Sequence, residues 1–402
     1  MDKTFIPIII GTDINAYYMA TCFHKAYGIK PYIIGKTQMG FTHYSSIIEK
    51  VEINNRLDDP KQFMTIINQF VSGVNHKGKE LLLLGTNDHY VRLIVENSDE
   101  LRKDFRFNYL NEHLLNIFQN KEDFYELAEK EGLDIPETYF YKVGEPIDFA
   151  PSRFPVILKP SNGIEYYRHS FTGQEKVYRL NTMEEVISVI KTIEDSGYTN
   201  SLIIQDYIPG DDTYIWDSVL YVNTKGKAEL VTFGQVALQE HEATAIGNYT
   251  AIVSRYNEEM MTKLKDFLER VGYHGFANVD MKYDQRDGKL KVFEVNVRQG
   301  RSSYYATQMG HNLARYLVED VIQGKEKDLV YAYEEVLFTI VPKYILKKYV
   351  TNPEMNEEVR RLIKEKKVEN PLFYSKDRSP LRLPYLLVRQ ARYNKKYKQA
   401  TW

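Results

Sequence analysis

The ten residues from Val292 to Arg301, Val-Phe-Glu-Val-Asn-Val-Arg-Gln-Gly-Arg, constrain the fold of this chain more than any other stretch. Their alternation of polar and apolar residues predicts a β-strand with two unlike faces. One face carries Val292, Glu294, Asn296 and Arg298, and the other carries Phe293, Val295 and Val297. A carboxylate and an amide oxygen about 7 Å apart along one face are hard ligands of the kind that Mg²⁺ accepts while it keeps water and substrate phosphates. The strand therefore predicts a metal site with arginine charge beside it.

A second strand-like stretch, Gly275 to Tyr283, precedes the first and is joined to it by the turn Gln285 to Gly288. A hairpin of the two would bring Asp280 beside Glu294. For an isolated Glu-x-Asn pair, an edge hairpin with solvated charges is the better interpretation. Here an acid precedes the turn, and the Glu-x-Asn pair and an arginine follow it. This register favours a metal site with the ligands Asp280, Glu294 and Asn296.

Three further stretches complete a resemblance to the nucleotide site of the ATP-grasp ligases. The strand Arg153 to Pro160 looks like the one that carries the phosphate-binding lysine, here Lys159, and Ser161 to Gly173 looks like the loop that closes on the triphosphate. The segment Ser201 to Asp212 looks like the interdomain hinge. A helix that begins near Lys121 looks like the one that supplies the first nucleotide lysine. All the pieces occur in the family's order.

The resemblance implies a role for each of these residues. The two lysines would bind the α- and β-phosphates, the hinge backbone would pair with adenine, and an acid after the hinge would take the ribose hydroxyls. The implied ATP-binding residues are Lys121, Lys159, Gln205, Asp206, Tyr207, Ile208 and Asp212. Mg²⁺ would bridge the β- and γ-phosphates on its three ligands. Arg298 would neutralise the transferring phosphoryl group, and Arg301 would hold a substrate carboxylate. With these roles, Arg298 and Arg301 are the predicted catalytic residues.

One stretch departs from the family pattern. The loop after the second lysine is usually rich in glycine, but here Tyr166, Tyr167 and Arg168 stand between Gly163 and Gly173. The phosphate contacts of this loop therefore stay open.

An ATP-grasp ligase phosphorylates a carboxylate, and an amine then attacks the acyl phosphate, so its site needs positioning and charge neutralisation rather than a covalent nucleophile. Across its whole length the chain looks most like the D-aspartate ligases of bacterial cell-wall synthesis. That resemblance implies ATP and Mg²⁺, a small acidic amino acid activated at its side-chain carboxylate, and an anionic peptidoglycan precursor whose lysine ε-amine accepts it. The alternative is another carboxylate-amine ligase, of the dipeptide or D-alanine:D-alanine type.

Two other classes of function are disfavoured. A nicotinamide redox module would need a dinucleotide fingerprint with three glycines in the first turn, and the turn that begins at Gly11 has one. A catalytically silent ATP-binding regulator would not need the intact set of three metal ligands. ATP consumption that depends on an amino acid would separate these classes from a ligase.

The N-terminal region reads as a parallel α/β unit. The expected elements are a strand over Phe5 to Ile10, a helix over Ile14 to Ala26, a strand over Pro31 to Ile34 and a strand over Leu81 to Leu84. The turn after the last strand ends at Asp88, which either faces a cleft or lies in a solvated loop. The fold class is thus α/β and α+β: an ATP-grasp fold with a Rossmann-like N-terminal domain over 1–118, a nucleotide and metal domain over 119–330, and a basic C-terminal extension over 331–402.

The middle of the chain predicts strands with connecting helices. The expected strands are Val177 to Leu180, Leu202 to Ile208, Tyr214 to Val222 and Ala228 to Gln235, and the expected helices are Met183 to Ile193, Glu258 to Val271 and Tyr304 to Ile322. A cap from Ser302 or Ser303 would leave the start of the last helix near the phosphates. Gln239 to Tyr249 has no period, and we interpret His241 within it as a surface histidine rather than a proton shuttle.

Composition indicates the class of protein and the cellular compartment in which it is expected. The chain has 402 residues, of which 43% are hydrophobic and 27% charged, which is typical of a folded globular protein. Its single cysteine, Cys22, excludes internal disulfides and is expected to be a buried apolar residue. The apolar run before Gly11 is too short for a signal peptide or a spanning helix. We therefore expect a cytoplasmic protein.

The C-terminal tail is strongly basic. From Val341 onward it carries 16 Lys and Arg against 6 acids, although the whole chain has a net charge of −2. Basic residues interleaved with tyrosines also suit single-stranded nucleic acid, but no nucleic-acid fold signature is present, so no nucleic-acid partner is expected. We expect a tail with few internal partners that binds an anionic acceptor, and a peripheral contact with an anionic membrane surface stays open.

Overall fold

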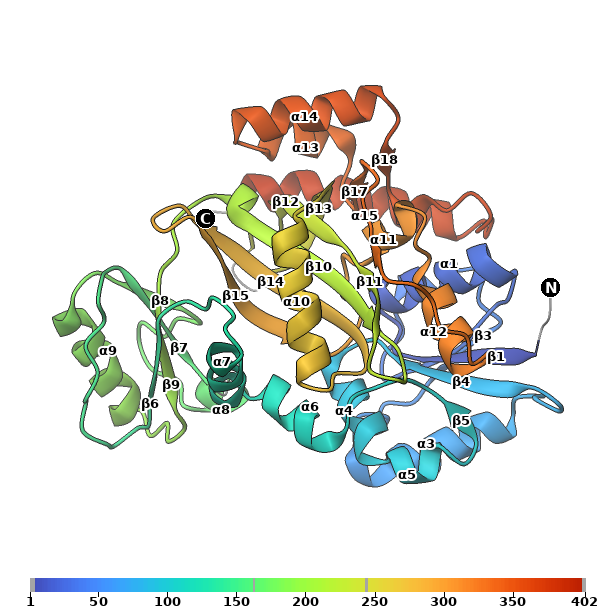
Figure 1. The fold of residues 1–402 in the computed structure, drawn as a ribbon, viewed down its shortest axis with the longest axis horizontal. Coiled ribbons are helices and arrows are strands. Elements are labelled where there is room, and N and C mark those ends of the chain that lie inside the picture. The colour runs from blue at the N-terminus through green and yellow to red at the C-terminus, as the bar shows by residue number, and fades with distance from the viewer. Residues whose placement is uncertain (1–3, 162, 243–244, 400–402) are drawn as a thin grey trace. The chain divides into compact units, whose positions relative to one another are not determined.

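The computed structural model describes residues 4–161, 163–242 and 245–399. The chain divides into two compact units, drawn together in Figure 1. The main unit comprises 1–118, 211–280 and 295–402, and the small unit comprises 119–210 and 281–294. The sequence predicted three consecutive domains, which are not the same as these two units. That division remains a prediction.

The main unit begins with a five-stranded parallel sheet in the order β3-β2-β1-β4-β5. Its strands are β1 (Phe5–Ile10), β2 (Tyr32–Gly35), β3 (Lys50–Ile53), β4 (Glu80–Gly85) and β5 (Phe105–Arg106), and its helices are α1 (Ile14–Tyr27), α2 (Gly40–His43), α3 (Pro60–Ser72), α4 (Asp88–Glu96), α5 (Ser98–Leu101) and α6 (Glu112–Gln119). Every residue of β1 is buried, as parallel strands covered on both faces require. The predicted strand-helix-strand opening is confirmed. Cys22 is buried and unoxidised, also as predicted.

The second sheet of the main unit has nine strands, with the path β15-β14-β10-β12-β13-β17-β18. They are β10 (Ile215–Val222), β12 (Phe233–Gln239), β13 (Tyr249–Arg255), β14 (Gly275–Asp284), β15 (Lys289–Asn296), β17 (Leu337–Thr339) and β18 (Val368–Glu369), with β11 (Ala228–Val231) and β16 (Val330–Tyr331) off this path. Helix α10 (Glu258–Arg270) precedes β14. The predicted hairpin therefore forms, and its residues 281–294 belong to the small unit.

Two element predictions in the main unit were wrong. Ala228 to Gln235 is two strands, because the hydroxyl of Thr232 accepts a hydrogen bond from Val219 N and interrupts the ladder. The single helix over Tyr304 to Ile322 is two helices, α11 (Tyr304–Gln308) and α12 (Leu313–Val321), because Gly310 at φ 95° ends the first.

The predicted serine cap at α11 is also wrong. The hydroxyl of Ser303 accepts a hydrogen bond from Gly300 N at 2.6 Å, and that of Ser302 donates to Asp217 at 3.3 Å. Neither hydroxyl caps the helix. Both instead stabilise the turn that follows β15.

The C-terminal segment packs into the core of the main unit. Helices α13 (Lys343–Tyr349), α14 (Pro353–Lys364) and α15 (Arg382–Gln399) follow the last long strand, and Figure 1 draws them in orange and red. The buried residues that they add to the core are Ile345, Leu346, Met355, Val359, Leu362, Leu386, Tyr393 and Tyr397. The same cluster contains side chains of α1 and of both sheets. The segment is therefore part of the fold rather than an appended tail.

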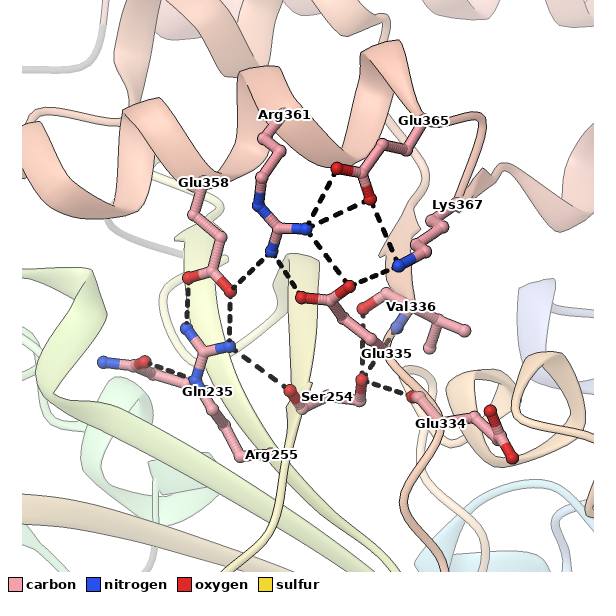
Figure 2. A network of polar contacts seen from close by, with 10 residues as sticks. All are labelled: Gln235, Ser254, Arg255, Glu334, Glu335, Val336, Glu358, Arg361, Glu365 and Lys367. Atoms are coloured by element: carbon pink, nitrogen blue, oxygen red, sulfur yellow. Dashed lines mark hydrogen bonds and ion pairs between the residues drawn. The ribbon is translucent and has the colours of Figure 1, made fainter.

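The expectation of few internal partners for the basic tail was wrong. Figure 2 shows Arg361 paired with Glu335 and Glu365, and Lys367 paired with the same two carboxylates. Arg255 on β13 forms a bidentate pair with Glu358 on α14, at 2.8 and 2.6 Å. Several charged side chains of this segment therefore have ion-pair partners within the unit.

The small unit is built on a four-stranded antiparallel sheet in the order β6-β9-β7-β8. Its strands are β6 (Thr138–Tyr141), β7 (Val156–Pro160), β8 (Tyr178–Leu180) and β9 (Leu202–Asp206), and its helices are α7 (Lys121–Lys130), α8 (Gly163–Arg168) and α9 (Met183–Asp195). The apolar face of α9 packs its Val186, Ile190 and Ile193 into a core with Val156 and Leu158. Asn162, in the predicted closing loop, lies outside the described residues, as do Ala243 and Thr244 in the segment of His241.

In the part of the chain that the structure describes, no helix combines the length and the apolar character needed to cross a bilayer.

Candidate active site

The small unit brings together two of the predicted nucleotide residues, Lys121 and Lys159. Alternation along β7 buries Val156 and Leu158 in the core, and Lys159 projects from the other face. Its Nζ lies 3.5 Å from Gln205 Oε1, and Lys121 Nζ lies 3.2 Å from Glu294 Oε2. Desolvation, reinforced by the positive charge of Lys121 and opposed by Glu294, lowers the pKa of Lys159 to about 8. The two ammonium groups therefore repel each other in a site where an anion would stabilise both.

Gln205 has a structural role within this site. Its side chain is 2% exposed and donates to Tyr125 Oη and to Thr138 Oγ1, each at 2.9 Å. The Tyr125 hydroxyl in turn donates to Phe293 O at 2.9 Å. The amide is therefore held with its oxygen toward Lys159, which fixes the end of that side chain.

The predicted hinge residues Asp206 and Tyr207 are already engaged within the small unit. Arg286 forms a bidentate pair with Asp206 at 2.5 and 3.2 Å. The backbone N–H of Asp206 donates to Glu137 O, and that of Tyr207 donates to Pro155 O. Ile208 is buried, with 3% exposure. The Asp206 carboxylate thus anchors the hinge, and any adenine recognition uses backbone groups other than these two N–H donors.

The main unit brings together Asp280, Asn296 and Arg298. Asn296 Nδ2 donates to Asp280 Oδ2 at 2.9 Å, and Arg298 Nη2 donates to Asn296 Oδ1 at 3.2 Å. The Tyr249 hydroxyl donates to the other oxygen of Asp280 at 2.9 Å. Asp88 forms an ion pair with Arg298 at 3.0 Å, so the polar turn after β4 contacts the predicted site. The sequence signal for Asp88 was its place directly after a buried strand.

The predicted metal set is divided between the two units. Asp280 and Asn296 belong to the main unit, and Glu294 belongs to the small unit. Among the described residues, no group of three or more His, Cys, Asp or Glu side chains is placed to hold a metal ion. Two carboxylates and one amide oxygen do fit Mg²⁺ that keeps waters and phosphate oxygens as its other ligands. The three-residue site stays a prediction.

A tight turn positions the two predicted catalytic arginines. A Cβ on Gly300 would lie 1.7 Å from Asn278 Oδ1, so a larger residue at position 300 would displace the Asn278 side chain. Asn278 donates at 2.7 Å to Asp217, whose burial raises its pKa to about 6. No sequence pattern predicted this buried carboxylate, because Asp217 is far from the turn along the chain.

Arg301 and Asp212 contact residues that adjoin the segment of His241. Arg301 Nη2 lies 3.8 Å from Glu240 Oε1, and Glu240 is only 4% exposed. Asp212, the predicted ribose ligand, accepts from Gln239 N at 3.0 Å and from Gln239 Nε2 at 2.8 Å. Its Oδ2 also lies 2.8 Å from His241 Nε2. Both carboxylate oxygens of Asp212 are therefore engaged, and sequence reasoning missed this use of His241.

The chain shares its fold with solved structures of a ligase and a synthetase. No family model matches it. It is 14% identical to an L-amino acid ligase from Bacillus licheniformis, with a TM-score of 0.57 over 80% of this chain and 75% of that one. It is 13% identical to an N5-carboxyaminoimidazole synthetase from Staphylococcus aureus, with a TM-score of 0.58 over 88% and 87%. The fold is therefore that of the ATP-grasp carboxylate-amine ligases, as the sequence predicted.

A relative that matches this chain along nearly its whole length identifies the family within this class of ligases. The chain is 36% identical over 388 residues to a D-aspartate ligase of Enterococcus faecium, and the match covers 94% of this chain and 92% of that one. The chain belongs to the D-aspartate ligase family.

Proposed function

We propose that this protein is an ATP-dependent ligase that activates the side-chain carboxylate of D-aspartate as an acyl phosphate and joins it to the lysine ε-amine of a peptidoglycan precursor. The observation that carries the proposal is the 36% identity along nearly the whole length of a D-aspartate ligase. The alternative is another ATP-grasp ligase, of the dipeptide or D-alanine:D-alanine type. The cations around the turn at Gly300, Arg298 and Arg301, favour an acidic substrate and so favour a D-aspartate ligase over this alternative.

The nucleotide would bind residues that suit its charge. Lys121 and Lys159 would bind phosphate oxygens, and the depressed pKa of Lys159 supports this, because phosphates would restore its charged form. Gln205, Asp206, Tyr207 and Ile208 would form the adenine side, and Asp212 stays the proposed ribose residue. Asp280, Glu294 and Asn296 would hold Mg²⁺. When bound, ATP supplies the phosphoryl group that gives the carboxylate a leaving group.

Arg298 and Arg301 would bind the reacting carboxylates. Arg298 donates to Asn296, one of the proposed metal ligands, which supports a role for it in neutralising the phosphoryl group in transfer. Arg301 has a loose pair with Glu240, and its Nε has no hydrogen-bond partner among the described residues. A guanidinium in this state can bind the α-carboxylate of aspartate through charge-assisted hydrogen bonds.

The proposal also includes an anionic acceptor substrate and a cytoplasmic location. An anionic precursor suits the basic face of α15, which exposes Arg392, Lys395 and Lys398. The same helix exposes Leu383, Leu387 and Val388 by more than half, which supports a peripheral contact with an anionic membrane. The single cysteine, the buried Cys22, is consistent in composition with a cytoplasmic location.

The test is ADP release with D-aspartate, L-aspartate, D-alanine and D-glutamate side by side, with and without a nucleotide-linked muramyl pentapeptide. We expect D-aspartate to exceed D-alanine by on the order of a hundredfold or more in kcat/KM, because a neutral side chain leaves a site cation unpaired. Mass analysis should find one aspartyl unit added to the peptide. Equal turnover of D-alanine would contradict the D-aspartate assignment and leave a generic ligase.

A further inference from the structure

The segment that joins β12 to β13 contains a histidine held by a carboxylate. His241 Nε2 lies 2.8 Å from Asp212 Oδ2, and the side chains are 22% and 16% exposed. An ionised carboxylate can only accept, so Nε2 carries the proton and Nδ1 carries the lone pair. No described residue bonds to Nδ1. The ring therefore presents a basic nitrogen with a fixed orientation.

Asp212 is itself fixed in position. The Gln239 backbone and side chain donate to its two oxygens at 3.0 and 2.8 Å. The ring of Tyr397 packs edge-on against His241 with a centroid separation of 5.2 Å. The chain thus positions the carboxylate, the carboxylate positions the imidazole, and a tyrosine limits its rotation, which is the arrangement of an oriented general base.

Both ends of this segment contact predicted site residues of the main unit. At one end, Glu240 pairs with Arg301 at 3.8 Å. At the other end, the hydroxyl of Tyr249 donates to Asp280 at 2.9 Å. Glu240, the neighbour of His241, therefore contacts a proposed substrate-binding arginine, and Tyr249, the first residue of β13, contacts a proposed metal ligand.

The other titratable groups near the ring are engaged or neutral. Lys396 pairs with Glu242 at 2.9 Å and lies 3.7 Å from Glu240, so these charges are partly balanced. Burial raises the pKa of Tyr397 well above its usual range, and its hydroxyl donates to Gln239 O at 2.8 Å. Among these groups, His241 is the one with a ring nitrogen that no described residue contacts through a hydrogen bond.

We propose that His241, oriented by Asp212, is the general base that deprotonates the acceptor amine. This inference rests on the proposed ligase function, which brings a lysine ammonium to an acyl phosphate. A lysine side chain has an ordinary pKa of about 10.4, so at neutral pH almost all of it is protonated and unable to attack.

The step balances with groups that are present. Nδ1 of His241 takes one proton from the ammonium, and Asp212 stabilises the resulting imidazolium. The amine nitrogen then bonds to the acyl carbon. As the carbon–oxygen bond to phosphate breaks, the second proton leaves nitrogen with the phosphate, which departs as hydrogen phosphate. An amide and a protonated His241 remain.

Hydroxylamine as the acceptor tests whether His241 acts in deprotonating the acceptor amine or in an earlier step. It is largely unprotonated at neutral pH and captures an acyl phosphate as a hydroxamate without needing a base. We expect His241→Gln to lower transfer to the pentapeptide by about a hundredfold or more. Hydroxamate formation from D-aspartate and ATP should stay within about twofold, which also shows that the variant is folded. His76→Gln, at an exposed position, is the matched control.

The pH profile supplies a second readout. In the His241→Gln variant, transfer should rise about tenfold per pH unit toward the ordinary pKa of lysine, while the unchanged protein levels off earlier. Asp212→Asn should lower transfer in the same way, and because Asp212 is also the proposed ribose residue, it should raise the KM for ATP as well, which His241→Gln should not.

Equal loss of both products in His241→Gln, or no loss of either, overturns the assignment of His241. Failure of the unchanged protein to form any hydroxamate from D-aspartate is a different result. It overturns the ligase proposal, and this inference with it.

Discussion

Two groups of cations in this protein differ in how many carboxylates surround them. In the cluster of Figure 2, Arg361 and Lys367 share Glu335 and Glu365, and these cations lower the pKa of Glu335 to about 2. In the small unit, Lys121 has Glu294, whereas Lys159 faces an amide oxygen and has a pKa lowered to about 8. The first cluster is satisfied by the protein itself. The second has two cations and one carboxylate, so a further anion would stabilise it, which is typical of a ligand site rather than a structural ion-pair network.

The largest effect is expected for Glu294→Gln. The substitution removes the negative charge of a proposed Mg²⁺ ligand, so turnover should be lost, while stability changes by less than about 0.5 kcal/mol because the side chain is exposed. Turnover against Mg²⁺ concentration and thermal unfolding measure the two quantities. Near-normal kcat would show that the carboxylate only balances Lys121.

Lys159→Met tests the cation that faces an amide oxygen rather than a carboxylate. Losing a charged hydrogen bond to phosphate should raise the Kd for ATP by about tenfold to a hundredfold, with the affinity for the amino acid unchanged. Titration calorimetry with ATP gives the Kd. Lys367→Met is the control from the satisfied cluster and should leave ATP binding alone. Unchanged ATP affinity in the Lys159 variant would refute its assignment.

The lowered pKa of Lys159 predicts a pH dependence for ATP binding. Below pH 8 the ammonium is charged and binds phosphate, and above pH 8 the free protein loses that charge. The Kd for ATP should therefore rise about tenfold between pH 8 and pH 9.5 or so. Lys159→Arg stays charged throughout and should flatten this rise if it still binds ATP. A similar rise in the arginine variant would assign the effect to another group.

The same lowered pKa has a consequence for stability, with a definite sign. The folded protein disfavours the charged lysine, so this group destabilises the fold below pH 8. That cost is relieved as the pH rises from about 8 toward the unfolded value near 10.4. Unfolding curves of the unchanged protein and of Lys159→Met should therefore converge over this range.

The smallest effect is expected for Arg361→Met. The substitution breaks the pairs with Glu335 and Glu365 and should lower the free energy of unfolding by about 1 kcal/mol, because the side chains are partly exposed. Activity should not change. Glu335 has its pKa lowered, so its pairs stabilise the fold above the ordinary carboxyl pKa and are lost as the pH falls toward 2. Denaturant unfolding at pH 7 and pH 3 should show a smaller difference between the two proteins at pH 3.

Much of the fold was predictable because its patterns are local. The hairpin ending at Asn296, the strand that carries Lys159 and the N-terminal parallel unit all follow from alternation, buried runs and turn residues within a few positions of one another. Element ends and breaks were less predictable. The break in the helix after Tyr304 depends on the left-handed conformation of Gly310, which glycine permits but does not require.

The sequence by itself determined which residues carry charge, which strand faces are polar, and the ATP-grasp order of the motifs. The tertiary structure alone decided which charges are satisfied. Asp206 is paired with Arg286, Asp212 with His241, and the basic C-terminal helices with acids of the main unit. These partners lie tens to hundreds of residues apart in the chain. Only packing decides which of many equivalent carboxylates reaches a given cation, because local periodicity specifies the face of an element but not what is packed against it.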